Sequence, residues 1–335
     1  MLLLASHIWK GVMLQDNFGR KFEYLRLSIT DVCNFSCDYC LPDGYDCSGA
    51  RDFLSLSEIK TLVTAFAKLG MKKIRITGGE PGLRKDLVDV IRICNNTQGI
   101  EQIALTTNGF NLENNIEQWV EAGLTHLNVS ADSLDPRLFQ AITGHQNLES
   151  ILRGVDKAIS LGLSNVKLNA VLLKTFNLDQ IDQYLSWIKN KSVTVRFIEL
   201  METGDNKDYF ATNHISGEYI KQDLLTKGWT QVIKGKLAGP AQEFCHPDYQ
   251  GRFGLIMPYS TDFCKTCNRL RIASNGKLHL CLFAEQGIDL RPYLTEDGIE
   301  QTCDALLAAM TNKEVGHELA KNFTGATTHL AMLGG

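Results

Sequence analysis

Hydrophobic and polar positions follow two different periodicities along most of the chain. Short runs rich in β-branched residues, in which apolar and polar positions alternate, predict strands. The strand candidates are Tyr24–Ser28, Lys73–Thr77, Ile103–Thr106, His126–Ser130, Val166–Val171 and Val193–Ile198. Between them, apolar residues recur with helical spacing, as in Ser57–Leu69, which begins with a Ser57 cap, and in Glu149–Leu161. Six βα units therefore follow one another along the chain.

A βα series of this kind indicates parallel strands joined by right-handed crossover helices. The expected fold class is α/β, with the strands closing fully or partly into a barrel whose ligands bind at the C-terminal strand ends. After Met201 the pattern changes: Gly204–His214 is polar and loop-like, Ser216–Lys227 predicts a helix, and short strand-like pieces separated by glycines follow. We predict an N-terminal extension (1–16), a partial barrel (17–201) and a smaller C-terminal element (202–335).

Polar and basic side chains share one period-two face of the predicted strands. Along the first to the sixth strand they are Arg26 and Ser28, Arg75 and Thr77, Thr106, Asn128 and Ser130, Lys167 and Asn169, and Arg196. The alternative is that these residues face outward beneath helices, but helix-covered faces should be apolar, and Leu25, Ile76 and Phe197 suit them better. Because buried cations without partners are costly, we expect the barrel interior to hold a large anionic ligand.

Three thiols follow the first strand directly, at C-x3-C-x2-C spacing: Cys33, Cys37 and Cys40. Thiolates ligate iron–sulfur clusters and zinc, but a closed cluster or a structural zinc normally takes four protein ligands. Three ligands leave one metal position open, so this spacing indicates a site that binds a small molecule at the metal. The alternative is a zinc knuckle completed from elsewhere in the chain.

A second group of three thiols, Cys264, Cys267 and Cys281, has C-x2-C-x13-C spacing near the other end of the chain. The alternative here is a structural zinc completed by His279, Cys245 or His246. Arg269 and Arg271 follow this motif and alternate with apolar residues. On a strand their guanidinium groups would point to the same side, next to the metal.

Composition narrows the range of partners. The net charge of −4 shows no basic surplus, so we expect no nucleic-acid ligand. Residues 1–9 are apolar but lack a basic n-region and are too short to span a bilayer, so we expect no membrane association and a cytoplasmic protein. Ten cysteines in such a chain are interpreted as reduced thiols and metal ligands rather than disulfides.

The segment Thr77-Gly78-Gly79-Glu80-Pro81 follows the second strand, where paired glycines allow close approach of a ligand and a carboxylate can accept from an ammonium group. Alone it could be a plain turn. Together with the first three thiols it resembles the S-adenosylmethionine (SAM) binding segment of the radical SAM superfamily. With the second thiol motif, its Asn268–Arg271 run and the terminal Gly334-Gly335, the chain from about Asn17 onward resembles the GTP 3′,8-cyclase family.

That resemblance implies an incomplete (βα)6 TIM-type barrel closed by a C-terminal α+β element. It also implies a lyase that converts GTP to (8S)-3′,8-cyclo-7,8-dihydroguanosine 5′-triphosphate in the first step of molybdenum cofactor biosynthesis. In the family, SAM cleavage gives a 5′-deoxyadenosyl radical that abstracts the ribose 3′ hydrogen, after which the carbon radical attacks C8 of guanine. The one departure noticed is Leu333, where isoleucine is expected.

The resemblance also implies a role for each matching residue, including two [4Fe–4S] clusters. Cys33, Cys37 and Cys40 would hold the first cluster, with Tyr39, Gly79, Ser130 and Met201 at SAM. Cys264, Cys267 and Cys281 would hold the second cluster, whose free iron meets the guanine. GTP would contact Arg26, Arg75, Thr106, Lys167, Arg269, Leu270 and Arg271, and Gly334 and Gly335 would enter the active site.

Partners implied by the resemblance are an electron donor such as a flavodoxin or ferredoxin and, downstream, cyclic pyranopterin monophosphate synthase. The assembly expected is a monomer or homodimer. Two alternative functions remain. A radical SAM peptide-modifying maturase would be expected to carry a longer cysteine array. A non-enzymatic iron–sulfur electron carrier or structural metal protein would favour fully ligated clusters and would have no use for an arginine-lined cavity.

Overall fold

Six parallel strands with helices between them form the first part of the chain in a computed structural model, which describes residues 11–46, 48, 52–233, 235–321, 323–325 and 331. The strands are β1 (Tyr24–Ser28), β2 (Lys73–Thr77), β3 (Gln102–Thr107), β4 (His126–Ser130), β5 (Asn165–Leu172) and β6 (Val193–Glu199). The helices are α1 (Leu56–Lys68), α2 (Leu87–Asn96), α3 (Leu112–Glu121), α4 (Pro136–Thr143), α5 (Leu148–Ser160) and α6 (Ile181–Ile188). Every predicted strand is confirmed to within one residue at each end.

The later part of the chain adds shorter elements. They are α7 (Lys207–Asn213), α8 (Glu218–Thr226), β7 (Thr230–Gln231), β8 (Gln242–Cys245), β9 (Arg252–Ile256), β10 (Arg269–Ile272), β11 (Lys277–His279), β12 (Ile288–Asp289) and α9 (Ile299–Met310). The prediction of a loop over Gly204–His214 is wrong, because this segment contains α7. Tyr209 and Phe210 pack against a small apolar cluster around Leu200, and this tertiary contact stabilises a helix that the polar composition hides.

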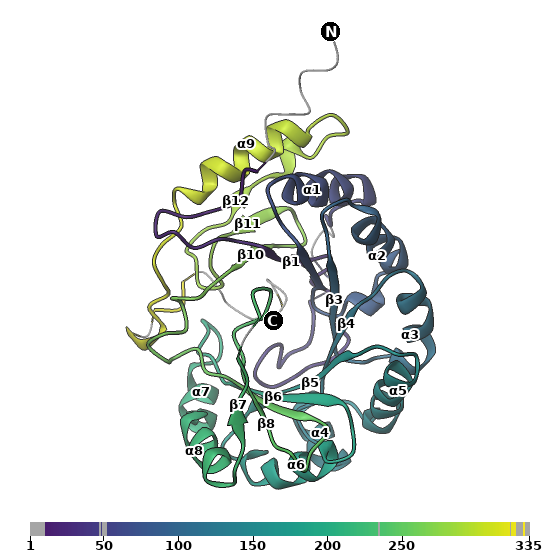
Figure 1. The fold of residues 1–335 in the computed structure, drawn as a ribbon, viewed down its shortest axis with the longest axis vertical. Coiled ribbons are helices and arrows are strands. Elements are labelled where there is room, and N and C mark those ends of the chain that lie inside the picture. Colours follow the sequence, from purple (N-terminus) through teal and green to yellow (C-terminus); the bar gives the residue numbers. More distant parts are fainter. Residues whose placement is uncertain are drawn as a thin grey trace.

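All strands belong to one sheet, in the order β12-β11-β10-β1-β2-β3-β4-β5-β6-β9-β8-β7. The C-terminal strands extend both of its edges, because β10 pairs in parallel with β1 and β9 pairs in parallel with β6. The sheet curves around a centre with helices on its outer side (Figure 1). It is not closed, since β7 and β12 remain its two ends, which confirms the predicted partial TIM-type barrel.

The two faces of the strands differ as the period-two pattern predicts. Leu25, Ile76 and Phe197 lie on the outer face, beneath the helices, and are completely buried in the main apolar core. The inner face carries the polar positions, and strand pairing sets Arg26 beside both Arg75 and Arg271. Hydrophobic burial therefore stabilises the barrel from outside, and the interior is free to be polar.

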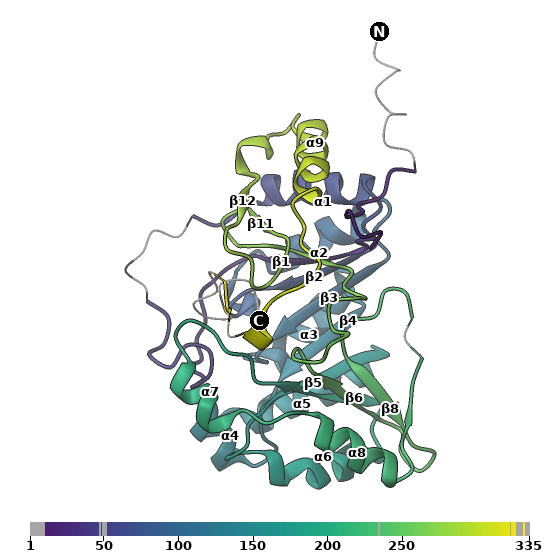
Figure 2. The same cartoon turned by 90° about the vertical axis from the view of Figure 1, so that its left-hand side faces the viewer.

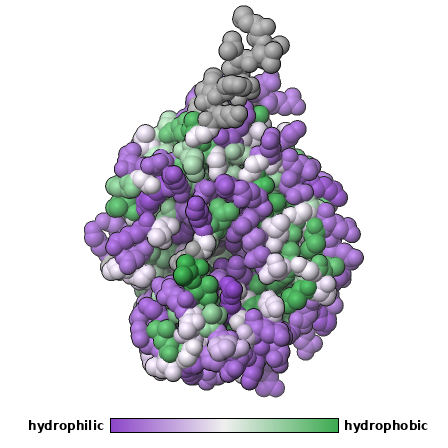
Figure 3. Space-filling view, in the orientation of Figure 1, coloured by the Kyte–Doolittle hydropathy of each residue, from purple (hydrophilic) through white to green (hydrophobic). Residues whose placement is uncertain are grey.

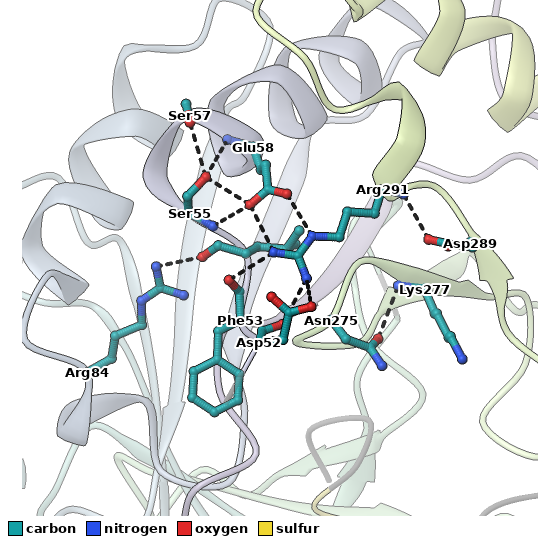
Figure 4. A network of polar contacts seen from close by, with 11 residues as sticks. Asp52, Phe53, Ser55, Ser57, Glu58, Arg84, Asn275, Lys277, Asp289 and Arg291 are labelled. Atoms are coloured by element: carbon teal, nitrogen blue, oxygen red, sulfur yellow. Dashed lines mark hydrogen bonds and ion pairs between the residues drawn. The ribbon is translucent and has the colours of Figure 1, made fainter. Parts of the chain in front are cut away.

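The start of α1 is tied to the C-terminal part of the chain (Figure 4). The predicted Ser57 cap is wrong: the Ser55 side chain accepts from the Glu58 backbone N–H, and the Glu58 carboxylate accepts from the Ser55 N–H at 2.7 Å. This is a capping box, which selects the serine three residues before the glutamate. Arg291 donates from Nε to Glu58 Oε1 at 2.8 Å and forms an ion pair with Asp52.

Helix α9 lies along α1 at one end of the molecule (Figure 2). The Thr61 hydroxyl of α1 donates to the Thr295 carbonyl at 3.0 Å, and Cys303 of α9 is buried against α1. The division at 16 and 201 stays a prediction. In the described part of the chain, no helix has the length and apolar character needed to cross a membrane.

We expect Ser55→Ala to lower the free energy of unfolding by about 1 kcal/mol, because it removes an N-cap. Ser57→Ala is the matched control and should change it by a few tenths of that amount, since among the described residues the Ser57 hydroxyl has the Ser55 hydroxyl as its hydrogen-bond partner and caps no backbone group. Thermal unfolding of the two apoproteins under identical conditions measures the difference. Equal midpoints for the two variants would contradict the assigned cap.

Candidate active site

An open cavity extends from the C-terminal ends of the parallel strands into the barrel interior. Its empty volume is about 1690 Å³ with the mouth included, and its walls come from the ends of β1 to β6 and from the C-terminal part of the chain. Figure 3 shows a hollow near the centre of the face seen in Figure 1, with hydrophilic side chains prominent around it. The position agrees with the expectation for a barrel of βα units.

The first three thiols line this cavity. Cys33, Cys37 and Cys40 lie on the loop that follows β1, which is fixed to the end of α4 by the Ser36 and Asp38 N–H groups. Burial raises the pKa of Cys37 well above its ordinary value, and the Asp132 carboxylate and the other two thiols raise it further. A bound metal would reverse this by stabilising the thiolates, so the group fits a metal centre.

The second three thiols line the same cavity, although they lie more than two hundred residues later. Cys264 and Cys267 form a turn before β10, and Cys281 follows β11. Burial disfavours the Cys267 thiolate, but Arg269 and Lys313 outweigh burial and lower its pKa. The two thiol groups therefore share one chamber.

None of the candidates for a fourth zinc ligand lines the cavity within the described ranges. His279, Cys245 and His246 are absent from its walls, and His246 packs instead beside Trp229 and Tyr249. No three His, Cys, Asp or Glu side chains of the described residues surround a point closely enough for a single metal ion. A four-iron cluster ligates each thiolate at a separate iron, so its ligands surround a larger volume than those of one ion.

The Gly78-Gly79 pair runs directly against the backbone that precedes Cys33. A Cβ on Gly79 would lie 2.4 Å from the Val32 carbonyl oxygen and 2.5 Å from that of Asp31. Only glycine fits so close an approach. The segment thus fixes the start of the cysteine loop as well as contributing to the cavity wall.

Glu80 is completely buried and does not line the cavity. Its carboxylate accepts from the Thr107 hydroxyl at 2.7 Å and from the Asn108 and Gly82 N–H groups at 2.6 and 2.7 Å. Burial raises its pKa to about 7, and these three donors oppose that rise. The carboxylate is therefore used within the protein, to join the end of β3 to the glycine segment, rather than for an ammonium group in the cavity.

The four residues predicted at SAM all line the cavity: Tyr39, Gly79, Ser130 and Met201. Asp132, which the sequence interpretation missed, lies among them. It accepts from the Tyr39 hydroxyl at 2.9 Å and from the Val171 N–H at 2.7 Å. The sequence did contain a signal for Asp132, because this residue stands two positions beyond Ser130 at the same strand end.

Basic side chains form the inner wall and floor. Arg26, Arg269 and Arg271 line the cavity with Thr106, whose hydroxyl accepts from Arg75 Nη1 at 2.9 Å. The remaining predicted cation, Lys167, lies on the same inner face, beside Asn128 of β4. Leu270 differs from the other predicted positions because it points to the opposite face and is fully buried in the core.

Further polar residues of this interior were not identified from the sequence, although the two-residue period of a strand places them on the same face. Lys73 and Tyr24 stand two residues before Arg75 and Arg26, and the Tyr24 hydroxyl accepts from Arg75 Nε. Burial disfavours the Tyr24 phenolate, but Arg75, Arg26 and Lys73 outweigh burial and lower its pKa to about 7. His317, which also lines the cavity, comes from an irregular segment that gives no sequence signal.

The interior carries an excess of positive charge. Burial lowers the pKa values of Lys73 and Lys167, and with the charges of Arg75 and Arg196 it brings both to about 8. Arg271 is only 8% exposed, and its Nη1 has no hydrogen-bond partner among the described residues. A multiply charged anion would supply the missing acceptors, so the cavity fits a polyphosphate or a similar ligand.

Comparison with protein families gives two matches that together span most of the chain. Residues 27–188 match the radical SAM superfamily, and residues 193–319 match the family described as Molybdenum Cofactor Synthesis C. The boundary between the matches falls at the start of β6.

Curated relatives are similar over nearly the whole chain. A protein of Psychromonas ingrahamii named GTP 3′,8-cyclase is 53% identical over 323 residues, covering 96% of this chain and 95% of its own. A protein of Vibrio atlanticus with the same name is 52% identical, covering 96% and 97%. Among solved structures, Streptococcus suis SuiB bound to S-adenosylmethionine has a TM-score of 0.60 at 15% identity, covering 94% of this chain and 72% of its own. That likeness supports the fold.

We expect Gly79→Ala to destabilise the loop that carries the first thiols, because its methyl group would collide with two backbone carbonyls. Gly235→Ala is the control, since a Cβ there meets nothing within 4 Å and its φ is not positive. Thermal unfolding of the apoproteins should show a lower midpoint for Gly79→Ala and no change for Gly235→Ala. Wild-type behaviour of Gly79→Ala would mean that the loop tolerates the methyl group.

Proposed function

The chain belongs to the GTP 3′,8-cyclase family of radical SAM enzymes, and from this premise we propose that its cavity binds SAM and GTP together, between two [4Fe–4S] clusters. The enzyme carries out the first step of molybdenum cofactor biosynthesis, the conversion of GTP to (8S)-3′,8-cyclo-7,8-dihydroguanosine 5′-triphosphate. The observation that carries the two-cluster assignment is that both three-thiol groups line one cavity with a cationic inner wall.

In this proposal residues 17–201 bind SAM. Cys33, Cys37 and Cys40 hold the first cluster, and the lining residues Tyr39, Gly79, Ser130 and Met201 contact SAM. Asp132 holds the Tyr39 ring in place through the hydroxyl hydrogen bond. When bound, the clusters and SAM supply the reducing electron, the 5′-deoxyadenosyl radical and an open iron for the guanine.

Residues 202–335 complete the site with Cys264, Cys267 and Cys281 around the second cluster. The triphosphate of GTP binds the inner face, where Arg26, Thr106, Arg269 and Arg271 line the cavity. Arg75 and Lys167 stand on the same face of neighbouring strands and contact it from there. Leu270 anchors β10 in the core, so that its two neighbouring guanidinium groups point to the same side. Guanidinium forks hold phosphate oxygens in a fixed orientation, which fixes the ribose against the site of radical formation.

The C-terminal tail is proposed to complete the cavity. Gly334 and Gly335 lie outside the described residues, but Ala331, three residues before Gly334, lines the cavity and is buried. We propose that the two glycines enter the site and position the reaction rather than bind GTP. The further proposals are a flavodoxin or ferredoxin as electron donor, cyclic pyranopterin monophosphate synthase as the next enzyme, a cytoplasmic location, and a monomer or homodimer.

Anaerobic reconstitution tests the proposed function directly. The wild-type chain should bind about eight iron and eight sulfide, since each cluster contributes four of each, and should convert GTP to the cyclic product with SAM and reductant. Cys37→Ala should abolish 5′-deoxyadenosine formation and keep the second cluster, whereas Cys245→Ala, outside both groups, should behave as wild type. One cluster with tightly held zinc at the second group would overturn the two-cluster assignment.

Nucleotide affinity should depend on the inner basic residues. Arg75→Ala and Arg271→Ala should each weaken GTP binding by about 2–5 kcal/mol, because each removes a charge-assisted contact from a desolvated site. Arg92→Ala is the control, since Arg92 is exposed on α2 and forms an ion pair with Asp89. Binding isotherms measure the loss, and wild-type affinity in both inner variants would place the nucleotide elsewhere.

GTP affinity should also fall as the pH rises through about 8. Lys73 and Lys167 lose protons near this pH in the free protein, and a bound triphosphate favours their charged forms, so binding takes up protons. The Tyr24 hydroxyl has a pKa of about 7 in the free protein. A bound triphosphate disfavours its phenolate form, so Tyr24 also takes up a proton when GTP binds. Calorimetry at pH 8 in two buffers of different ionisation enthalpy measures the uptake, which should shrink in Lys167→Met. Binding with no proton uptake would contradict the predicted coupling.

A further inference from the structure

A short segment after α9, residues 313–317, packs against the second thiol group. We call this segment the strap. The Lys313 ammonium is buried, with 6% exposure, and donates to the Leu280 carbonyl, next to Cys281. A Cβ on Gly316 would lie 3.2 Å from Cys264 Cβ and 3.3 Å from its Sγ, and the His317 backbone N–H donates to Cys264.

Arg20 joins this strap to the cysteine turn. Its Nη1 donates to the Cys264 carbonyl at 3.0 Å and to the Val315 carbonyl at 2.6 Å, and its Nη2 donates to the Glu314 carbonyl at 2.6 Å. The side chain is 10% exposed. One guanidinium group therefore connects a cluster ligand with two consecutive residues of the strap.

The Arg20 side chain is itself held in a fixed orientation. Its Nε donates to the Asp16 carboxylate at 2.6 Å, and the same carboxylate accepts from the Phe18 and Arg20 N–H groups at 3.0 and 2.9 Å. Burial disfavours ionised Asp16, but these hydrogen bonds and the Arg20 charge outweigh burial and lower its pKa. Gln15 pairs with Lys21 across this turn, so Arg20 projects from a closed hairpin.

The position of the strap controls quantities on which an iron–sulfur cluster depends. Hydrogen bonds to cluster sulfurs, nearby charge and solvent access set its potential and its stability. A cluster with three protein ligands and one open iron has no fourth protein bond to keep its loop in place. Moving the strap would withdraw the His317 N–H group and open the gap that Gly316 fills beside Cys264.

We propose that Arg20 is a positioning residue for the C-terminal cluster, acting by holding the 313–317 strap against Cys264. The inference rests on the proposed function, because it presupposes a cluster at Cys264, Cys267 and Cys281. Arg20 does not line the cavity, so its effect on the reaction passes through the cluster rather than through contact with SAM or GTP. The N-terminal hairpin thereby becomes part of the active-site framework.

The test uses the full-length reconstituted enzyme and its Arg20→Gln and Arg20→Lys variants. Arg20→Gln should shift the potential of the C-terminal cluster to more negative values, and speed its loss of iron to a chelator. Cyclised product should fall by about 10–100-fold, as for other residues that support metal ligands, while 5′-deoxyadenosine formation persists. Arg20→Lys should shift the potential in the same direction by less, since it keeps the charge, but should still lose product, because one ammonium group cannot bridge three carbonyls.

Arg291→Gln is the matched control for general destabilisation. Arg291 also ties distant segments together through a carboxylate and backbone carbonyls, but its contacts lie at the start of α1 and not at the thiols. It should lower the thermal midpoint without changing the cluster potential or the ratio of product to 5′-deoxyadenosine. The same potential shift in Arg291→Gln would overturn the proposal.

Gly316→Ala provides a second route if Arg20→Gln does not fold. The backbone φ of Gly316 is not positive, so alanine is compatible with the backbone, and the added methyl acts directly on Cys264. It should change the electron paramagnetic resonance signal of the C-terminal cluster and leave the SAM-bound signal unchanged. Wild-type spectra in Gly316→Ala, or wild-type potential and chelator kinetics in Arg20→Gln, would overturn the proposal. Fewer than two clusters in the wild type would instead overturn the proposed function.

Discussion

Repulsion among buried like charges is the constraint on which the interior of this barrel depends. Strand pairing sets Arg26 beside Arg75 and Arg271, and the burial of Arg75 and Arg271 leaves little water to screen their charges. Burial is the first cause that lowers the pKa of Lys73 from 10.5 to about 8, and repulsion from Arg75 and Arg196 adds to it. The shift corresponds to a cost on the order of 3 kcal/mol for keeping that charge. Neutral acceptors such as Thr106, Asn128 and Asn169 satisfy part of the cationic wall, and the apolar outer layer stabilises the fold despite it. Such a site is built to be completed by a polyanion.

Strand register brings the basic residues of separate strands together in one site. Arg26 pairs with Arg271 across the contact between β1 and β10, which joins two segments far apart in sequence. The same pairing sets the two thiol groups at opposite ends of β1, because Cys33 follows its last residue whereas Cys267 precedes the residue that pairs with Tyr24; both groups line the cavity between these ends. The open sheet matters here, because its two added edges let the C-terminal part of the chain contribute to both sides of the cavity.

Arginine recurs as the residue that ties distant segments together around this cavity. Arg84 donates to the carbonyls of Ile29 and Leu54, Arg291 reaches from the C-terminal part to Glu58 (Figure 4), and Arg20 bridges the hairpin, the cysteine turn and the strap. A planar guanidinium with five donors can hold several carbonyls in fixed relation, which an ammonium group cannot do. Arg20 thus anchors the turn of the second thiol group, whereas Arg84 and Arg291 anchor the segment that leads into α1.

The sequence by itself determined the strands, the helices on their outer face and the inward basic residues, because these follow from side-chain periods of two and 3.6 that act within one element. Thiol spacing likewise singled out the two cysteine groups that the structure brings to one cavity. Tertiary structure decided which edges β9 and β10 extend, that α7 forms around Phe210, and that Glu80 braces the glycine segment instead of facing the cavity. It also decided the role of Arg20, whose backbone carbonyl partners lie more than two hundred residues away. Every residue carries the same backbone carbonyl, so no local sequence pattern indicates which carbonyl a distant arginine will bind.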